Sequence, residues 1–195
     1  MGKIFLTSDT HFGHDRGFLW GPRGFTSVEE HDKAVIKNWN EAVKPEDTVF
    51  HLGDVMLGDN DYGMNCLRQL NGTIYIIPGN HDTSTRIKLY KTLENVRVLE
   101  SEIPGLDAAA ATFKYKKYKF YLSHHPTMTS NLDADPHLKA NLINLYGHTH
   151  QKNHFYEDRP YMFHVGLDSN NNTPILLDDA IQMMKDEIQN CFNLL

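Results

Sequence analysis

Cysteine is scarce and long apolar runs are missing from this chain of 195 residues. Its two cysteines, Cys66 and Cys191, lie far apart without a Cys-x-x-Cys spacing, which argues against a disulfide framework and against a thiolate metal site. We expect both to be reduced thiols. The apolar run at residues 4–7 soon meets Asp9, so it is too short for a signal peptide or a membrane span. The sequence therefore predicts a cytoplasmic protein that does not enter a membrane.

Basic clusters are missing as well. The formal net charge is -6, and no block of five or six basic residues occurs, so an extended surface for duplex nucleic acid is not indicated. A nucleotide could still bind locally, because bound metal ions would add positive charge that the count omits. There is no internal repeat, low-complexity tract or linker. We therefore expect a single domain over residues 1–195, with no indication of its oligomeric state.

Histidine, in contrast, is abundant, with 12 residues. Neutral imidazole is the commonest protein ligand for transition metals, so the chain has the material for a metal site. What matters is where those histidines stand relative to the secondary structure.

Apolar runs alternate with helical patterns over the first hundred residues. Strands are expected at 4–7, 48–52, 74–77 and 96–99, and helices from the capping box of Ser27 and Glu30 to Lys44-Pro45, over about 62–70 and over about 85–93. This alternation is typical of βαβ units and a largely parallel sheet. The later part predicts an antiparallel hairpin at 112–115 and 119–122, strands at 144–146 and 162–166, and a terminal helix capped by Asp178.

Five of the expected strands end in residues that can hold a metal or move a proton. They are Asp9 with His11, Asp54, Asn80 with His81 and Asp82, His124, and His148 with His150. Each segment taken singly has a plain alternative, a polar turn or a hydrogen-bonded histidine. Because all five share one location, after an apolar strand, we interpret them as one site at the carboxyl ends of the strands.

The ligand types narrow the choice of metal. Carboxylates, imidazoles and one amide oxygen suit manganese, iron, zinc, cobalt or nickel. Seven candidate ligands are too many for one ion that keeps open positions, so two divalent ions with a shared carboxylate are expected. Two-metal sites hold their ions roughly 3.5 to 4 Å apart and activate a shared water for attack on phosphorus.

The motifs Asp9-x-His11, Gly53-Asp54, Gly79-Asn80-His81-Asp82, Ser123-His124 and Gly147-His148-x-His150 resemble those of the calcineurin-like metallophosphoesterase family in order and spacing. The resemblance implies an α/β fold, a four-layer αββα sandwich of mixed sheets with the active site at the carboxyl ends of the strands. It also implies a dinuclear centre, with manganese as the preferred metal.

The resemblance further implies a role for each matching residue. Asp9, His11, Asp54 and His150 would hold one ion, and Asp54, Asn80, His124 and His148 the other. His81 would contact the substrate phosphoryl group and protonate the leaving oxygen, with Asp82 orienting its ring and Asn80 also near the substrate. The segment Val165-Gly166-Leu167-Asp168 also resembles small bacterial and phage members of this family. It departs from their pattern at one position, because His164 stands where an Asn commonly precedes the Val-Gly pair.

Several residues are open to two readings. Arg23 could clamp a substrate phosphate, or it could be an exposed loop arginine. Neighbours on an extended strand alternate in direction, so only one of His124 and His125 should face the site easily, and His125 is expected to pack nearby or to support a ligand. His14 and His51 are expected to be structural or to support ligands rather than to bind the metal. The loop at 12–25 and the segment at 127–139 are the expected walls of the substrate pocket.

The resulting hypothesis is a metal-dependent hydrolase of phosphate esters that uses a metal-bridging hydroxide. A phosphodiester of nucleotide type or another small substrate is favoured, and a phosphatase of small metabolites is the alternative. The competing class is a non-enzymatic metal-binding scaffold for a protein partner. Such a scaffold would be expected to lose the shared carboxylate or the acid, and this chain keeps both Asp54 and His81.

Overall fold

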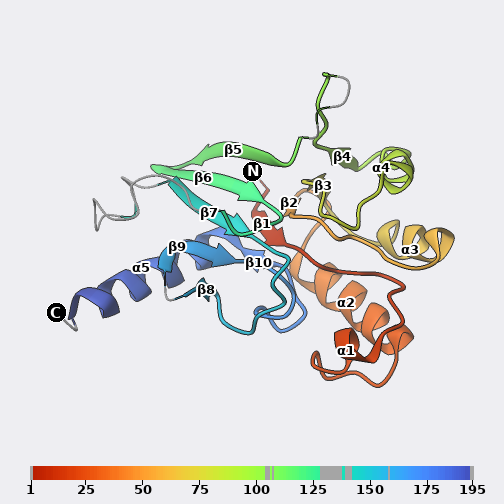
Figure 1. Cartoon of the computed structure of the whole chain (residues 1–195), viewed down its shortest axis with the longest axis horizontal. Helices are drawn as coiled ribbons and strands as arrows, with labels where there is room; N and C mark the ends of the chain where they lie inside the picture. The colour runs from red at the N-terminus through yellow and green to blue at the C-terminus, as the bar shows by residue number, and fades with distance from the viewer. Residues whose placement is uncertain are drawn as a thin grey trace.

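A computed structural model describes residues 2–103, 106, 108–127, 138, 142–157 and 159–193. In these ranges the chain forms two mixed sheets with helices beside them (Figure 1). The elements in chain order are β1 (Ile4–Thr7), α1 (Gly17–Trp20), α2 (Val28–Ala42), β2 (Thr48–His51), α3 (Asn60–Leu67), β3 (Thr73–Ile76), α4 (Ser84–Tyr90), β4 (Val96–Val98), β5 (Ala110–Tyr115), β6 (Tyr118–Ser123), β7 (Leu142–Tyr146), β8 (Phe155–Tyr156), β9 (Arg159–His164), β10 (Ile175–Leu176) and α5 (Leu177–Asn193).

The first sheet has the order β10-β1-β2-β3-β4, with β1 to β4 parallel and β10 antiparallel. Its register aligns the buried residues Phe5, Val49, Ile74 and Val96 in one row across the four parallel strands. This row belongs to a core with residues of α2 and α3, such as Trp39. Because side chains alternate along a strand, the neighbouring residues face the opposite side.

The second sheet has the order β5-β6-β7-β9-β8, in which β6, β7 and β9 are parallel. A second core joins Leu6 of β1 to Phe120, Leu145 and Phe163 of this sheet, and α5 contributes Met184 to it. Helix α5 contacts β9 as well as β1 and β10, so it packs against both sheets. Figure 1 shows α2, α3 and α4 gathered beside the first sheet and α5 extending away toward the carboxyl terminus.

The predicted α/β arrangement of two mixed sheets flanked by helices is confirmed, and so are the main strands. Helix α2 begins as expected, since the Ser27 hydroxyl accepts a hydrogen bond from the Glu30 amide at 3.2 Å. The terminal helix differs in its start. It begins at Leu177, so Asp178 lies in its first turn, where it accepts a hydrogen bond from Lys116 at 2.7 Å.

Three short elements, α1, β8 and β10, were not expected. With four, two and two residues, they are too short to produce a hydrophobic period in the sequence. Among the described residues, no helix is both long and apolar enough to cross a membrane.

Candidate metal centre

The parallel strands bring their carboxyl-terminal loops to one place. The Asp9 amide donates to the Gly53 carbonyl, the His11 amide to the Asp54 carbonyl, and the Gly147 amide to the His124 carbonyl, at 3.0, 3.0 and 2.9 Å. Hydrogen bonds thus join the loops after β1 and β2, and those after β6 and β7.

Five of the seven predicted metal ligands have a left-handed backbone. The positive φ angles are 58° at Asp9, 49° at His11, 58° at Asp54, 66° at His148 and 49° at His150. A residue with a Cβ adopts this conformation at a cost, and such strain concentrates at functional sites. The shared strain supports a common role for these residues.

The residues predicted to hold one ion lie together. Potential ligand atoms of Asp9, His11 and His150 are all within 4.8 Å of one another. Asp54 completes the set, because its Oδ2 is 3.6 Å from His11 Nε2. The potential ligand atoms of these four side chains are therefore close enough together to hold one cation.

The residues predicted to hold the other ion also converge. His124 Nε2 is 3.4 Å from Asp54 Oδ2, 3.0 Å from Asn80 Oδ1 and 3.2 Å from His148 Nδ1. The other ring nitrogen, Nδ1, lies 2.7 Å from the Leu52 carbonyl, which can only accept. His124 therefore directs Nε2 toward Asp54, and Asp54 stands between the two groups as expected.

Some buried polar atoms of the site have no hydrogen-bond partner among the described residues. They include Oδ1 of Asp9 and both ring nitrogens of His11. Buried polar groups without a partner are uncommon in folded proteins, since desolvating them is costly. A divalent cation would satisfy the Asp9 oxygen and one His11 nitrogen, so the donor set fits a metal.

The electrostatics of the site favour exchange of a proton for a metal. Burial lowers the pKa of His124, but Asp54 and Asp9 outweigh it and raise that pKa to about 9. Burial holds the pKa of His11 well below its usual value. Since a metal ligand must be deprotonated, binding at His124 would release a proton, and metal affinity would rise with pH.

His81 lies at the edge of this centre. Its side chain is 41% exposed, and its Nε2 is 4.0 Å from Asp54 Oδ2. Its backbone amide donates to Asp54 Oδ1 at 2.9 Å. The ring is therefore accessible from solvent while it faces the shared carboxylate.

Asp82 does not orient the His81 ring as predicted. The Asp82 carboxylate is buried and takes its hydrogen bonds from the backbone amides of Asp54, Val55 and Gly79 and from the Tyr90 hydroxyl. None of these reaches the imidazole of His81. Asp82 instead ties the loop after β3 to the loop after β2, because a carboxylate can accept several amide hydrogens at once.

Neither reading of Arg23 is correct. Its guanidinium is fully buried, so it is not an exposed loop arginine. Its Nε and Nη2 donate to the two oxygens of Asp168 at 3.0 and 2.7 Å, and Nη2 also donates to the Asp9 carbonyl at 2.8 Å. With its donors used inside the protein, Arg23 is not available to clamp a substrate phosphate.

Three further histidines were expected to stand outside the ligand set. His51 is buried beside the Thr10 hydroxyl, and burial lowers its pKa to about 3. The ring centroid of His14 lies 5.3 Å from that of His11. Only one of His124 and His125 was expected to face the site, but the ring centroid of His125 is 4.2 Å from that of His148, and His125 could join His124 and His148 in holding a metal. The chain has left the regular strand at this point, so alternation no longer applies.

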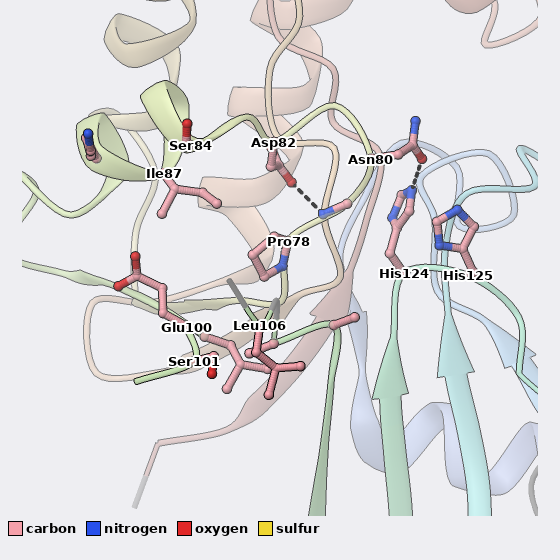
Figure 2. A pocket seen from close by; sticks show the side chains of 15 residues that line it. Pro78, Asn80, Asp82, Ser84, Ile87, Glu100, Ser101, Leu106, His124 and His125 are labelled. Carbon is pink, nitrogen blue, oxygen red and sulfur yellow. Dashed lines mark hydrogen bonds between the residues drawn. The ribbon is translucent and has the colours of Figure 1, made fainter. Parts of the chain in front are cut away.

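A cavity of about 550 Å³ adjoins the centre on the side of Asn80, His124 and His125 (Figure 2). Its walls come from helix α4, including Ile87 and Lys88, and from residues 99–101, 106, 108 and 109. The loop at 12–25 and the segment at 127–139 were the expected walls. None of residues 12–25 lines this cavity, and of the segment at 127–139 only residues 127 and 138 belong to the described part of the chain.

Asp168 is the residue of the site that the sequence reasoning missed. It follows β9, and its Oδ2 lies 2.9 Å from His150 Nδ1. A signal was present, because Val165-Gly166-Leu167-Asp168 is a sixth case of an apolar strand followed by a charged residue.

The fold and the site define an α/β protein with a cluster of histidine and aspartate side chains suited to two metals. Residues 3–170 match the calcineurin-like phosphoesterase superfamily domain. The chain belongs to this superfamily.

Relatives extend the match over nearly the whole chain. The uncharacterized protein MJ1445 of Methanocaldococcus jannaschii is 33% identical over 192 residues, which is 95% of this chain and 93% of that protein. The gene 66 protein of Mycobacterium phage L5 is 28% identical over 87% of this chain and 88% of its own length. Among solved structures, a protein of unknown function from Aquifex aeolicus, AQ665, shares the fold with a TM-score of 0.68 at 20% identity, covering 94% of this chain and all of that chain.

Proposed function

We propose that this protein is a metal-dependent hydrolase of phosphate esters, with two divalent cations and a preference for phosphodiesters. The observation that carries the proposal is the meeting of five residues with a strained backbone, at the ends of three strands, around buried ligand atoms that have no partner. Asp9, His11, Asp54 and His150 would hold one cation. Asp54, Asn80, His124 and His148 would hold the other, with manganese as the first metal to test.

When bound, the two cations would act as Lewis acids toward the phosphoryl oxygens and lower the pKa of a water. The protein's own part is positioning. Asp54 and Asp82 join the loops after β2 and β3 through backbone amides, and this fixes Asn80 and His81 beside the shared carboxylate. Because the ring of His81 reaches solvent, it is placed to hold a proton and to donate it to the leaving oxygen.

The cavity beside the centre offers room for an organic substituent of the phosphate. Its walls include the apolar residues Pro78, Ile87 and Leu99. Among its described lining residues Lys88 is the only lysine or arginine, and the lining also includes the acidic residue Glu100, which pairs with Lys91. A doubly charged monoester gains little from such walls, whereas the second substituent of a diester gains apolar contact.

The direct test compares bis-p-nitrophenyl phosphate with p-nitrophenyl phosphate as substrates of the manganese-loaded protein. We expect faster cleavage of the diester. Faster cleavage of the monoester would contradict the preference for diesters and would favour the alternative function, a phosphatase of small metabolites. If neither is cleaved with manganese, iron, zinc, cobalt or nickel, the enzyme proposal fails in favour of a metal-binding scaffold.

His81→Ala separates the acid from the ligands. We expect turnover of the diester to fall by roughly 10²- to 10⁴-fold, the usual contribution of a general acid, while two manganese ions still bind. Metal content is measured by elemental analysis after gel filtration. His154→Ala serves as the matched control, because this histidine stacks on Phe163 outside both ligand groups. Loss of a metal ion from His81→Ala would identify His81 as a ligand instead.

A further inference from the structure

The two ring nitrogens of His150 have different surroundings. Nδ1 lies 2.9 Å from Asp168 Oδ2, and Nε2 lies 3.9 Å from Asp9 Oδ1. An ionised carboxylate can only accept, so Nδ1 carries the hydrogen and Nε2 presents a lone pair toward Asp9. Arg23 Nη2 is also near Nδ1, but at the longer distance of 3.4 Å, so the contact with Asp168 decides the tautomer.

Arg23 in turn holds Asp168. The guanidinium donates to both oxygens of the carboxylate, and the Arg23 side chain is fully buried. The fork of donors therefore pairs the carboxylate with a buried cation and fixes it in two directions.

The same arginine connects the first motif to helix α2. Its Nη2 donates to the Asp9 carbonyl, and its Nη1 lies 3.0 Å from His31 Nε2. The other nitrogen of His31 is 2.7 Å from the Asp32 carboxylate, which also accepts the Gly13 amide. One buried network therefore supports Asp9 through its backbone and His150 through its ring.

We propose that Arg23 and Asp168 are positioning residues for one of the two cations, the one that Asp9, His11, Asp54 and His150 would hold. Asp168 fixes the tautomer and the direction of His150, and Arg23 fixes Asp168 and the backbone of Asp9. Partners of this kind around metal-binding histidines orient the ring and raise its basicity. The inference rests on the proposed metal centre. His124 needs no such partner, because a backbone carbonyl holds its Nδ1.

The test is a manganese titration of Asp168→Asn, followed by calorimetry and by electron paramagnetic resonance of the free ion. An asparagine can offer an N–H to Nδ1 and so favour the wrong tautomer. We expect the wild type to bind two ions, and the variant to bind one of them roughly 10- to 100-fold more weakly with the other unchanged. Unchanged affinity for both ions in the folded variant would overturn the proposal.

Asp47→Asn is the matched control. Asp47 is also a buried carboxylate that accepts two hydrogen bonds, from the amides of Lys3 and Lys44, but it stands outside the site. We expect this control to keep both affinities. If the control and Asp168→Asn lose the same affinity, the role of Asp168 is structural only and the proposal fails. Arg23→Lys, which keeps the charge without the fork, should show a smaller loss at the same site.

The tautomer can also be read in the wild type, where folding is not in question. Nitrogen-15 spectra of the imidazoles in the metal-free protein at alkaline pH, assigned with His150→Gln, should show the proton of His150 on Nδ1. A proton on Nε2 would overturn the inference even if every variant failed to fold. A wild type that binds no metal would instead contradict the proposed function, and the tautomer would remain a separate result.

Discussion

The Asp82 carboxylate joins two loops through hydrogen bonds of ordinary length. It accepts from the backbone amides of Asp54, Gly79 and Val55 at 2.7, 2.9 and 3.1 Å, and from the Tyr90 hydroxyl at 2.8 Å. An amide side chain has one acceptor oxygen and cannot replace two carboxylate oxygens. The buried carboxylate is therefore a support for the metal centre rather than a partner of the acid.

This role predicts the behaviour of Asp82→Asn. We expect the free energy of unfolding to fall by about 3 kcal/mol, because hydrogen bonds to a charged group are lost and backbone donors are left buried. Urea denaturation of the metal-free protein measures this free energy. Tyr90→Phe, which removes one of the four bonds, should cost about half as much. Equal stabilities of Asp82→Asn and the wild type would show that the loops do not depend on this carboxylate.

A second residue-scale prediction concerns His164, which is buried beside the Ser169 hydroxyl. Burial lowers its pKa from 6.5 to about 3. His164 therefore takes up a proton near pH 6.5 in the unfolded chain, but only near pH 3 in the folded protein. Stability contributed by the neutral ring is complete above the unfolded pKa and is lost as the pH falls toward the folded pKa.

His164→Asn removes this dependence. Between about pH 6 and pH 4 we expect the unfolding free energy of the wild type to decrease with falling pH by up to about 1.4 kcal/mol per unit more than that of the variant. Urea unfolding at several pH values gives both slopes. Parallel slopes would mean that the folded protein accepts a proton on His164 at ordinary pH.

At the scale of elements, the site depends on how closely the loops after β2 and β3 approach. Gly53 has a φ of +88°, and a Cβ placed on it would lie 2.6 Å from Gly79 Cα. Gly24 offers a contrast, because its φ is +94° but no atom lies within 4 Å of the Cβ position. Both glycines allow a left-handed backbone, and Gly53 additionally allows contact between two loops.

Gly53→Ala and Gly24→Ala therefore form a matched pair. The alanine at 24 should cost about 1–2 kcal/mol of unfolding free energy, the strain of a left-handed residue. The alanine at 53 should cost clearly more and should also weaken manganese binding, since the loop that carries Asp54 must move. Urea denaturation and metal titration test this. If Gly53→Ala binds manganese like the wild type, the loops can separate without harm to the centre.

At the scale of the whole molecule, the chain has a net negative charge, and some of its carboxylates are buried together in the site. Burial raises the pKa of Asp9, and the nearby Asp54 raises it further, although His150 and His124 oppose this. Two divalent cations would remove the repulsion between these carboxylates. Because the ligands come from both sheets, the cations would also link the two halves of the fold.

Metal binding should therefore stabilise the whole protein. At free manganese 100 times the dissociation constant, each site adds about 2.7 kcal/mol to the free energy of unfolding, and a chelator removes it. Thermal unfolding with manganese and with a chelator measures the resulting shift of the unfolding midpoint. Asp54→Asn, which alters the shared carboxylate, should lose most of it. A midpoint that does not respond to manganese would contradict a metal centre made from both sheets.

The sequence by itself determined the strands and the residue types at their ends. An apolar run that stops before Asp9, Asp54 or His148 is a local pattern, and parallel strands must present such ends at one edge. The helix start at Ser27 is equally local, because the capping box lies within the four consecutive residues from Ser27 to Glu30. The α/β class and the convergence of the candidate ligands follow from these patterns, and the structure agrees with both.

Only the tertiary structure decided the contacts between residues distant in the chain. The pairing of Arg23 with Asp168 spans 145 residues, and the bonds from Asp82 to Asp54 and Val55 span 28 and 27. No local period encodes such partners, because they depend on how the two sheets and their loops pack. Because of that packing, Arg23 is a buried support rather than the predicted substrate clamp. Asp82 links two loops rather than orienting His81, and His125 lies at the site.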